Sequence, residues 1–459
     1  MKSMTLENIA KACGGELVLN GAESSLEIEG AVIDSRLVKE NYLFFATVGE
    51  RVDGHDYINK AFLSGAAVAV CQYIPEEVKG ACIVVEDTFL ALKQIAKYYR
   101  ESLDIKVVGI TGSVGKTSTK EFIASVLAQK YKVLKTEGNF NNEVGLPLTV
   151  LKICKEHEVA VLEMGISDFG EMTRLSEIAQ PDVCVITNIG QCHLEQLGDR
   201  DGVLRAKTEV FANLKENGTA CLFAEDDKLQ SISNVNGKKP VFYGMQSTAD
   251  IYATDVKNKG LLGSECRIHA GDVTIEAKIP LPGKHMVYNA LAATAVGITL
   301  GLSDEEIATG IGAVEAVSGR SHLIHTDKYT IIDDCYNANP VSMKAAVDLL
   351  GEAITRKVAV LGDMFELGEN EKQLHYQVGA YAAEHKTDVL VCVGGLSREM
   401  YKGALEAANK KKSPEVHYFA TLEECISGIG AILEPEDSVL VKASHGMHFE
   451  TLVEQLRSM

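Results

Sequence analysis

Short, nearly uninterrupted apolar runs alternate with amphipathic stretches along the middle of this 459-residue chain. Strands that are apolar on both faces, with helices between them, are typical of a parallel sheet covered on both sides. We therefore expect such a sheet from about residue 104 onward. Its strands are expected at 106–111, 133–136, 159–164, 183–188 and 220–224.

Two other regions, the first 103 residues and residues 250–280, differ from this pattern. In the first 103 residues the apolar runs are shorter, and we expect strands at 31–33, 42–45, 67–70 and 83–85 with helices at 57–64 and 88–99. Residues 250–280 alternate apolar and polar positions, which predicts antiparallel strands, and a helix is expected after Gly283.

A third region begins near Gly319 and alternates strands with helices again, which predicts a second doubly wound sheet. Its strands are expected at 330–333, 358–361, 389–393 and 439–441. The predicted fold class is therefore α/β with three domains, in agreement with about 150 residues per domain. They are a small N-terminal α/β domain at 1–103, a central parallel-sheet domain with an added antiparallel segment at 104–317, and a Rossmann-like domain at 318–459.

Composition narrows the class of protein. The net charge of −19 argues against nucleic acid or an anionic membrane as the main partner. The 11 cysteines form no CxxC pair, which indicates reduced thiols rather than disulfides or a zinc site. No apolar run approaches ~18 residues, and the N-terminus lacks a signal-like apolar segment. We expect a cytoplasmic enzyme that neither spans nor enters a membrane.

The strongest chemical motif follows the first central strand. The run ends in a glycine-bearing turn, and Lys116 and Thr117 open a helix. Backbone N–H groups in such a turn, together with the helix N-terminus, bind phosphate, while the lysine reaches the β- and γ-phosphates and the hydroxyl takes a position on Mg²⁺. The usual pattern has glycine where Ile110 stands, and Gly112 lies inside the loop instead. A plain helix-capping turn is the alternative.

Polar residues follow other central strands at the same edge of the sheet. Glu163 ends one strand, and His193 follows Thr187 and Asn188 at the end of the next. A carboxylate and an imidazole beside a nucleotide phosphate can hold Mg²⁺, which needs few protein ligands. The alternative is a capped strand end and a surface histidine.

Three further groups of polar residues stand out, and the first of them is open to two interpretations. The asparagine-rich segment at 136–147 is either a turn-rich loop or a site for a polar substrate. By helical pattern alone Lys207 is a solvated surface lysine. Asp333 and Asp334 leave a buried strand after Arg320, and such an arginine could neutralise phosphate charge in a transition state.

Together these residues resemble the Mur ligase family, the ATP-dependent amide-forming enzymes of peptidoglycan precursor synthesis, over essentially the whole chain. The resemblance implies a cytoplasmic ligase that joins D-alanyl-D-alanine to UDP-N-acetylmuramoyl-tripeptide through an acyl phosphate. It implies ATP and two Mg²⁺ ions as cofactors, small-molecule substrates as partners, and a monomer. The family's phosphate loop matches Thr111, Gly112, Ser113, Val114, Gly115, Lys116, Thr117 and Ser118.

The resemblance also assigns roles to the other motifs. It implies that the metal ligands are Thr117, Glu163, His193 and Lys207, with Lys207 carbamylated and therefore anionic. It implies that the remaining nucleotide contacts are His285, Asn289, Arg320, Asp334, Tyr336 and Asn337. The catalytic group it implies is Lys116, Lys207, His193, Arg320 and Asp334. The substrate contacts it implies are Ser35 and Arg36 in the uridine-diphosphate-binding domain, and Asn139, Asn141 and Asn142 in the central domain.

Two positions depart from the family pattern, since His445 stands where arginine is usual and Met286 where asparagine is commoner. Three rival functions fit these residues less well. The ligase that adds the third amino acid carries an Asp-Asn-Pro-Arg motif that is absent here, and folylpolyglutamate synthase lacks this N-terminal domain. An ATP-driven scaffold would not need the complete set of site residues. Whether the tripeptide ends in lysine or diaminopimelate stays open.

Overall fold

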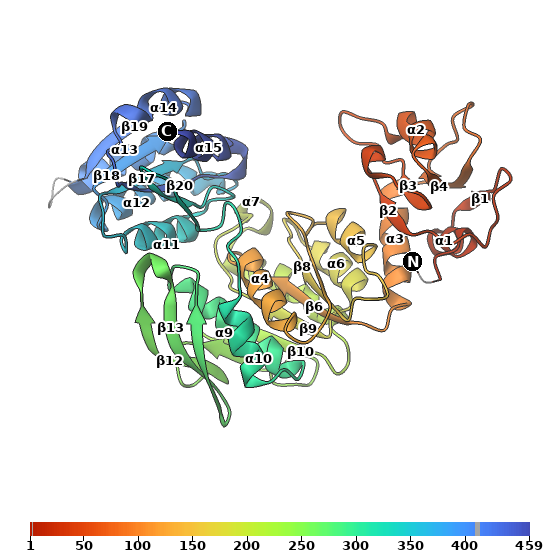
Figure 1. Cartoon of the computed structure of the whole chain (residues 1–459), viewed down its shortest axis with the longest axis horizontal. Coiled ribbons are helices and arrows are strands. Elements are labelled where there is room, and N and C mark those ends of the chain that lie inside the picture. Colours follow the sequence, from red (N-terminus) through yellow and green to blue (C-terminus); the bar gives the residue numbers. More distant parts are fainter. Residues whose placement is uncertain (2, 409–413) are drawn as a thin grey trace.

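Three sheets organise the residues that the computed structural model describes, which are 1, 3–408 and 414–459 (Figure 1). Each sheet carries helices and lies in its own part of the sequence, and the predicted three-domain α/β fold is thereby confirmed. In Figure 1 the central sheet lies below and between the other two, with the N-terminal sheet to the right and the C-terminal sheet to the left.

The N-terminal sheet has the strand order β1-β5-β4-β3-β2, and β1 is antiparallel to its neighbour while the other pairs are parallel. Its strands are β1 (Glu16–Val18), β2 (Gly30–Val32), β3 (Tyr42–Phe45), β4 (Ala66–Cys71) and β5 (Ala81–Val84). Its helices are α1 (Leu6–Cys13), α2 (Ile58–Leu63) and α3 (Thr88–Glu101). The pattern analysis missed α1 and β1.

The central sheet has the order β14-β13-β12-β11-β10-β9-β6-β8-β7. The predicted antiparallel segment continues this sheet rather than forming another, since β12 pairs in parallel with β11 and antiparallel with β13. The strands are β6 (Lys106–Thr111), β7 (Val133–Lys135), β8 (Val159–Glu163), β9 (Val183–Ile186), β10 (Thr219–Phe223), β11 (Val241–Gly244), β12 (Ile251–Asn258), β13 (Ser264–Ala270) and β14 (Val273–Ile279).

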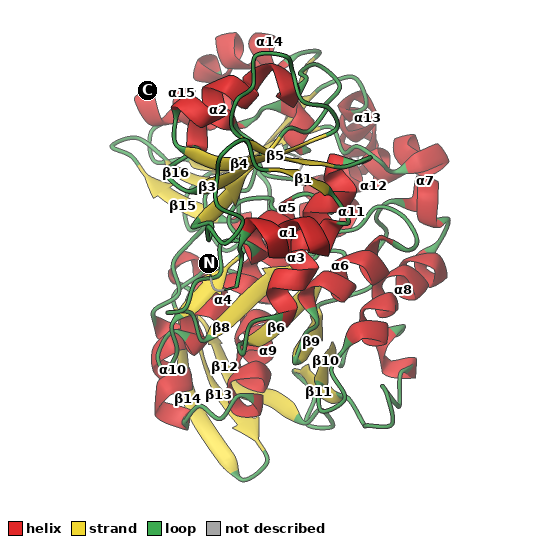
Figure 2. Cartoon of the chain, turned by 90° about the vertical axis from the view of Figure 1, so that its right-hand side faces the viewer, coloured by secondary structure: helices red, strands yellow, loops and turns green. Residues whose placement is uncertain are grey.

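Helices cover both faces of the central sheet. On one face α4 packs against α9 and α10, and their apolar side chains form one buried cluster with those of the strands. On the other face α5 and α6 pack against α3 of the N-terminal region, so the two regions share a second cluster (Figure 2). The helices are α4 (Lys116–Leu127), α5 (Gly145–Val150), α6 (Glu171–Ala179), α7 (Leu194–Leu197), α8 (Arg200–Thr208), α9 (His285–Thr299) and α10 (Asp304–Gly312).

The C-terminal sheet has the order β15-β16-β20-β17-β18-β19, parallel except for β15. One face packs against α11, α12 and α13, and the other against α14 and α15. The strands are β15 (His322–His325), β16 (Thr330–Asp333), β17 (Lys357–Gly362), β18 (Val389–Val393), β19 (Glu415–Phe419) and β20 (Ser438–Lys442). The helices are α11 (Pro340–Leu350), α12 (Glu371–Glu384), α13 (Ser397–Ala408), α14 (Leu422–Gly428) and α15 (Glu450–Ser458).

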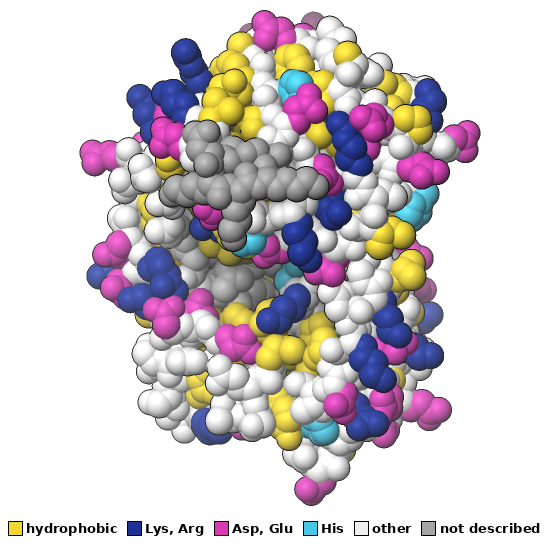
Figure 3. Space-filling model, turned by 90° about the vertical axis from the view of Figure 1, so that its left-hand side faces the viewer, with side chains coloured by type: hydrophobic (Ala, Val, Ile, Leu, Met, Phe, Trp, Pro, Cys, Tyr) yellow, Lys and Arg dark blue, Asp and Glu magenta, His cyan; other side chains and the backbone are white. Residues whose placement is uncertain are grey.

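The surface and helix lengths bear on the expected partners. On the face shown in Figure 3, acidic and basic side chains are interspersed. Within the described residues, each helix is too short or too polar to cross a membrane.

Candidate active site

The phosphate loop has the strand–turn–helix geometry that its sequence predicts. Strand β6 ends at Thr111, and α4 begins at Lys116 after two glycines with positive φ, 147° at Gly112 and 83° at Gly115. A Cβ added at Gly112 would lie 1.9 Å from Thr187 Oγ1, so this position excludes other residues. Lys116 Nζ donates to Gly112 O at 2.9 Å, and burial lowers the pKa of Lys116. This is the strand–turn–helix geometry in which backbone N–H groups can bind phosphate.

Glu163 lies at the carboxyl end of β8, beside the loop. It is 2 % exposed, and its Oε1 accepts hydrogen bonds from Asn141 Nδ2 at 2.8 Å and Thr117 Oγ1 at 3.3 Å. Its Oε2 is buried without a hydrogen-bond partner, and Lys120 Nζ lies 3.8 Å away. A buried carboxylate oxygen without a partner is costly, so this oxygen is suited to a hard cation.

Lys207 corrects the interpretation from helical pattern, because its position on α8 is 1 % exposed rather than solvated. Burial lowers the pKa of Lys207 to about 8. His193 Nδ1 lies 3.0 Å from Glu366 Oε2 of the C-terminal domain, and burial lowers the pKa of His193. Within the described residues, no group of three or more His, Cys, Asp or Glu side chains converges as a metal site.

The C-terminal domain contributes a second set of charged groups. The guanidinium of Arg320 lies 3.9 Å from the ring centroid of Tyr336, and its Nη2 donates to Thr117 Oγ1 at 3.3 Å. Asp334 Oδ2 accepts from Lys442 Nζ at 2.7 Å, and Lys442 also donates to Asn337 O at 2.9 Å. Sequence analysis missed the role of Lys442, a 2 %-exposed lysine that follows the apolar run of β20.

The first turn of α9 supplies another wall. Asn289 Oδ1 accepts from Thr119 Oγ1 at 3.0 Å, and its Nδ2 contacts Met286 Sδ at 3.4 Å. The methionine that departs from the family pattern therefore packs beside Asn289 as a weak acceptor. Burial lowers the pKa of His285. Three aromatic residues that were not predicted also line the cavity: Phe223 of β10, Tyr243 of β11 and Tyr288 of α9 itself.

One cavity of about 490 Å³ brings these groups together. The predicted residues that line it are Ser113–Ser118, Asn141, Asn142, Glu163, His193, His285, Asn289, Arg320, Asp334, Tyr336 and Asn337. The predicted residues that do not line it are Thr111, Gly112, Asn139, Lys207, Ser35 and Arg36. Of these, Asn139 is exposed, and Arg36 pairs with Asp34 at 2.6 Å in the N-terminal domain.

Family models match most of the chain. Residues 27–100 match the catalytic domain of the Mur ligase family, residues 110–297 the Mur ligase middle domain, and residues 319–445 the Mur ligase glutamate ligase domain. The matched segments therefore include strands of all three sheets.

Full-length relatives and solved structures agree with these models. The UDP-N-acetylmuramoyl-tripeptide–D-alanyl-D-alanine ligase of Bacillus subtilis is 39% identical, with 99% of each chain covered. A crystal structure of MurF from Acinetobacter baumannii superposes with a TM-score of 0.89 at 33% identity, covering 99% of each chain. The Thermotoga maritima MurF ligase in complex with ADP gives 0.81 at 29% identity, covering 94% of this chain and 97% of the other.

Proposed function

The chain belongs to the Mur ligase family, and we propose that it is the ATP-dependent enzyme that joins D-alanyl-D-alanine to UDP-N-acetylmuramoyl-tripeptide. The observation that carries this proposal is the single cavity lined by the phosphate loop and Glu163 on one side and by Arg320 and Asp334 on the other. It contains the donors that phosphoryl transfer needs, and the full-length relative at 39% identity carries this activity in its name.

The chemistry explains why ATP is required. A free carboxylate is a poor acyl donor, because its charge repels a nucleophile and oxide is a poor leaving group. Phosphorylation of the tripeptide carboxylate gives an acyl phosphate, which the amine of D-alanyl-D-alanine attacks with loss of phosphate. The protein needs no nucleophile of its own. Lys116 and the loop amides bind and orient the phosphates, and Arg320 faces them from the C-terminal domain.

Mg²⁺ fits the residues present. Thr117 and Glu163 would hold one ion, for which the unpartnered buried Oε2 of Glu163 is a suitable ligand. His193 and Lys207 would hold a second. Few protein ligands suffice, because Mg²⁺ takes much of its coordination from substrate phosphates and water. When bound, the ions neutralise charge that develops on the transferred phosphoryl group.

Carbamylation of Lys207 is part of the same proposal. A carbamate forms when a neutral amine adds to CO₂ and loses a proton, and a pKa of about 8 leaves a usable neutral fraction near pH 7. Lys207→Ala should abolish phosphate release, and short-chain carboxylic acids should restore part of it by replacing the carbamate. Full activity of this variant without any added acid would contradict the carbamate role.

The remaining assignments complete the proposal. Ser35 and Arg36 serve the uridine-diphosphate end of the substrate, and the asparagines Asn139, Asn141 and Asn142 serve the peptide side. We propose domain limits at 1–103, 104–317 and 318–459, a monomer, and a cytoplasmic location.

The test measures phosphate release from ATP and Mg²⁺ with each substrate alone and with both. Release only with UDP-N-acetylmuramoyl-tripeptide and D-alanyl-D-alanine together, with a product heavier by the dipeptide less water, is the expected result. Tripeptides ending in lysine and in diaminopimelate are compared side by side. Release with a free amino acid and the UDP-dipeptide would instead identify the ligase for the third residue. Release without either peptide substrate would favour the scaffold.

A further inference from the structure

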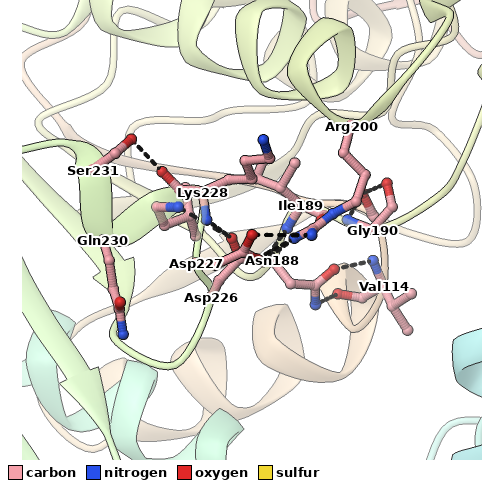
Figure 4. Close-up of polar contacts among 12 residues, drawn as sticks. Val114, Asn188, Ile189, Gly190, Arg200, Asp226, Asp227, Lys228, Gln230 and Ser231 are labelled. Atoms are coloured by element: carbon pink, nitrogen blue, oxygen red, sulfur yellow. Dashed lines mark hydrogen bonds and ion pairs between the residues drawn. The ribbon is translucent and has the colours of Figure 1, made fainter.

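The turn that follows β9, residues 187–190, is hydrogen-bonded to the phosphate loop. The side-chain amide of Asn188 meets both backbone groups of Val114, since Oδ1 accepts from Val114 N at 3.0 Å and Nδ2 donates to Val114 O at 2.9 Å (Figure 4). Thr187 Oγ1 donates to the same carbonyl at 2.6 Å, and Ser113 N donates to Asn188 O at 3.1 Å. The position of the loop therefore depends on the position of Asn188.

The next residue, Ile189, is fixed by two charged side chains from other elements. Asp226, on the loop after β10, accepts from Ile189 N at 2.7 Å through Oδ2. Arg200, at the start of α8, donates through Nε to Ile189 O at 2.8 Å. Figure 4 shows both side chains converging on this turn. Both backbone groups of Ile189 thus have a charged partner, and charge-assisted hydrogen bonds are stronger than neutral ones.

Asp226 is itself held in place. It is 8 % exposed, and its Oδ1 accepts from Lys228 N at 3.0 Å and Leu229 N at 3.1 Å. Neither Asp226 nor Arg200 lines the cavity. Their hydrogen bonds to Ile189 reach the phosphate loop through the two adjoining residues. One is Asn188, and the other is Gly190, whose backbone N donates to Ser113 Oγ at 2.8 Å.

We propose that Asp226 and Arg200 are positioning residues for nucleotide binding. By fixing Ile189 they fix Asn188, and Asn188 keeps Val114 and the phosphate loop in the binding conformation before the nucleotide arrives. A preorganised loop binds the nucleotide more tightly, because no conformational entropy of the loop is lost on binding. The inference rests on the proposed function in taking an adenine nucleotide as the ligand.

The neighbouring Asp227 offers a matched control. It pairs with the outer edge of Arg200, with Oδ1 at 2.5 Å from Nη2 and Oδ2 at 3.2 Å from Nη1, but its side chain is 69% exposed. It makes no contact with Ile189 in the described structure. An exposed ion pair of this kind contributes little.

The experiment measures equilibrium binding of ADP with Mg²⁺ to the full chain by calorimetry. Asp226→Asn keeps the shape but replaces one acceptor oxygen by a donor, and should weaken binding about tenfold. Arg200→Met should weaken it about threefold, and Asp227→Asn less than twofold. The KM for ATP should rise in parallel while kcat at saturating ATP stays within about twofold, because the occupied loop has the same contacts.

A double variant separates positioning from general destabilisation. If Asp226 acts through Asn188, then adding Asp226→Asn to Asn188→Ala should weaken binding less than about twofold further. An undiminished tenfold loss in that background would overturn the inference, as would unchanged ADP binding by both Asp226→Asn and Arg200→Met. Should Asp226→Asn fold poorly, Arg200→Met decides the matter from the more exposed side of the turn. The expected losses of ADP binding in an enzyme that ligates no substrate pair would contradict the proposed function. They would still support Asp226 and Arg200 as positioning residues.

Discussion

The N-terminal and central sheets meet through an apolar core, whereas the central and C-terminal sheets meet around a polar cavity. At the first junction Ile95 and Tyr99 of α3 belong to the same buried cluster as Leu146 of α5 and Ile178 of α6. Arg100, 1 % exposed, closes the junction by donating to Ala179 O at 2.9 Å and to Gln180 O at 3.2 Å.

The second junction is built differently. Arg320 donates to Thr117 at the cavity, and His193 pairs with Glu366 of the C-terminal domain. The apolar clusters of the C-terminal sheet are separate from those of the central sheet, although Leu261 from the loop between β12 and β13 packs against one of them.

This difference indicates which of the two junctions can open. Separating the first junction would expose buried apolar surface and a buried guanidinium, both of which are costly. Separating the second exchanges a few partly buried polar contacts for water, which costs less than exposing an apolar core. We therefore expect the first two domains to move as one body and the C-terminal domain to close over the nucleotide.

The largest expected effect is at Arg100. Arg100→Met removes donors from three backbone carbonyls, those of Leu103, Ala179 and Gln180, and should lower the free energy of unfolding by about 3 kcal/mol. Chemical denaturation monitors this loss, with activity per folded molecule unchanged. Lys106→Met is the control. Both cations lie near Asp182, at 4.0 Å for Arg100 and 3.2 Å for Lys106, but Lys106 is exposed. Equal losses in the two variants would show that burial of Arg100 does not strengthen the junction.

Arg320 should show the opposite behaviour. Arg320→Met should lower kcat/KM by about 100-fold while changing the free energy of unfolding by less than about 1 kcal/mol. Phosphate release with both substrates measures the first quantity, and denaturation the second. Arg398→Met, at an exposed arginine of the same domain, should leave both unchanged. Wild-type rates from Arg320→Met would remove the arginine from the site.

Tyr99 tests one hydrogen bond within the first junction. Its hydroxyl donates to Ile153 O at 2.5 Å, and Tyr99→Phe should lower the free energy of unfolding by about 1 kcal/mol. Tyr98→Phe, at the half-buried neighbour, should change it by much less. A thermal melt of the two variants against wild type gives the comparison, and identical melting temperatures would argue that water replaces the hydroxyl there.

The smallest effect is expected at Glu366. Its side chain is 64% exposed, so Glu366→Gln should change the free energy of unfolding by less than about 0.5 kcal/mol, despite the contact with His193. Glu369→Gln, an exposed glutamate on the same segment, serves as the reference in the same denaturation series. A loss above about 1 kcal/mol would mean that polar contacts also bind this junction firmly.

The sequence predicts best what is encoded locally. The phosphate loop and the helix after it are a continuous segment, so the glycines, Lys116 and Thr117 could be placed without tertiary information. The buried central strands form apolar runs for the same reason. Strands β15 and β19 were missed because their residues are half-buried or exposed and form no such run.

Contacts between distant segments could not be predicted in this way. Lys207 has the local pattern of a surface lysine, and only the family resemblance marked it as a site residue. Lys442 meets Asp334, which lies 108 residues away in the sequence. Arg100 stands in the last turn of α3, where an exposed cation is favourable, and its burial depends on carbonyls of residues 179 and 180.

The position of α4 beside α9 and α10 on one face of the central sheet has a consequence for synthesis on the ribosome. Thr119 meets Asn289, 170 residues later, and Ser125 Oγ donates to Gly310 O at 2.7 Å. A nascent chain that has not reached α10 therefore carries the phosphate-loop helix with an apolar face uncovered, which makes it prone to aggregation. All strands of the C-terminal sheet come from residues 322–442. This sheet can therefore form from the last part of the chain alone.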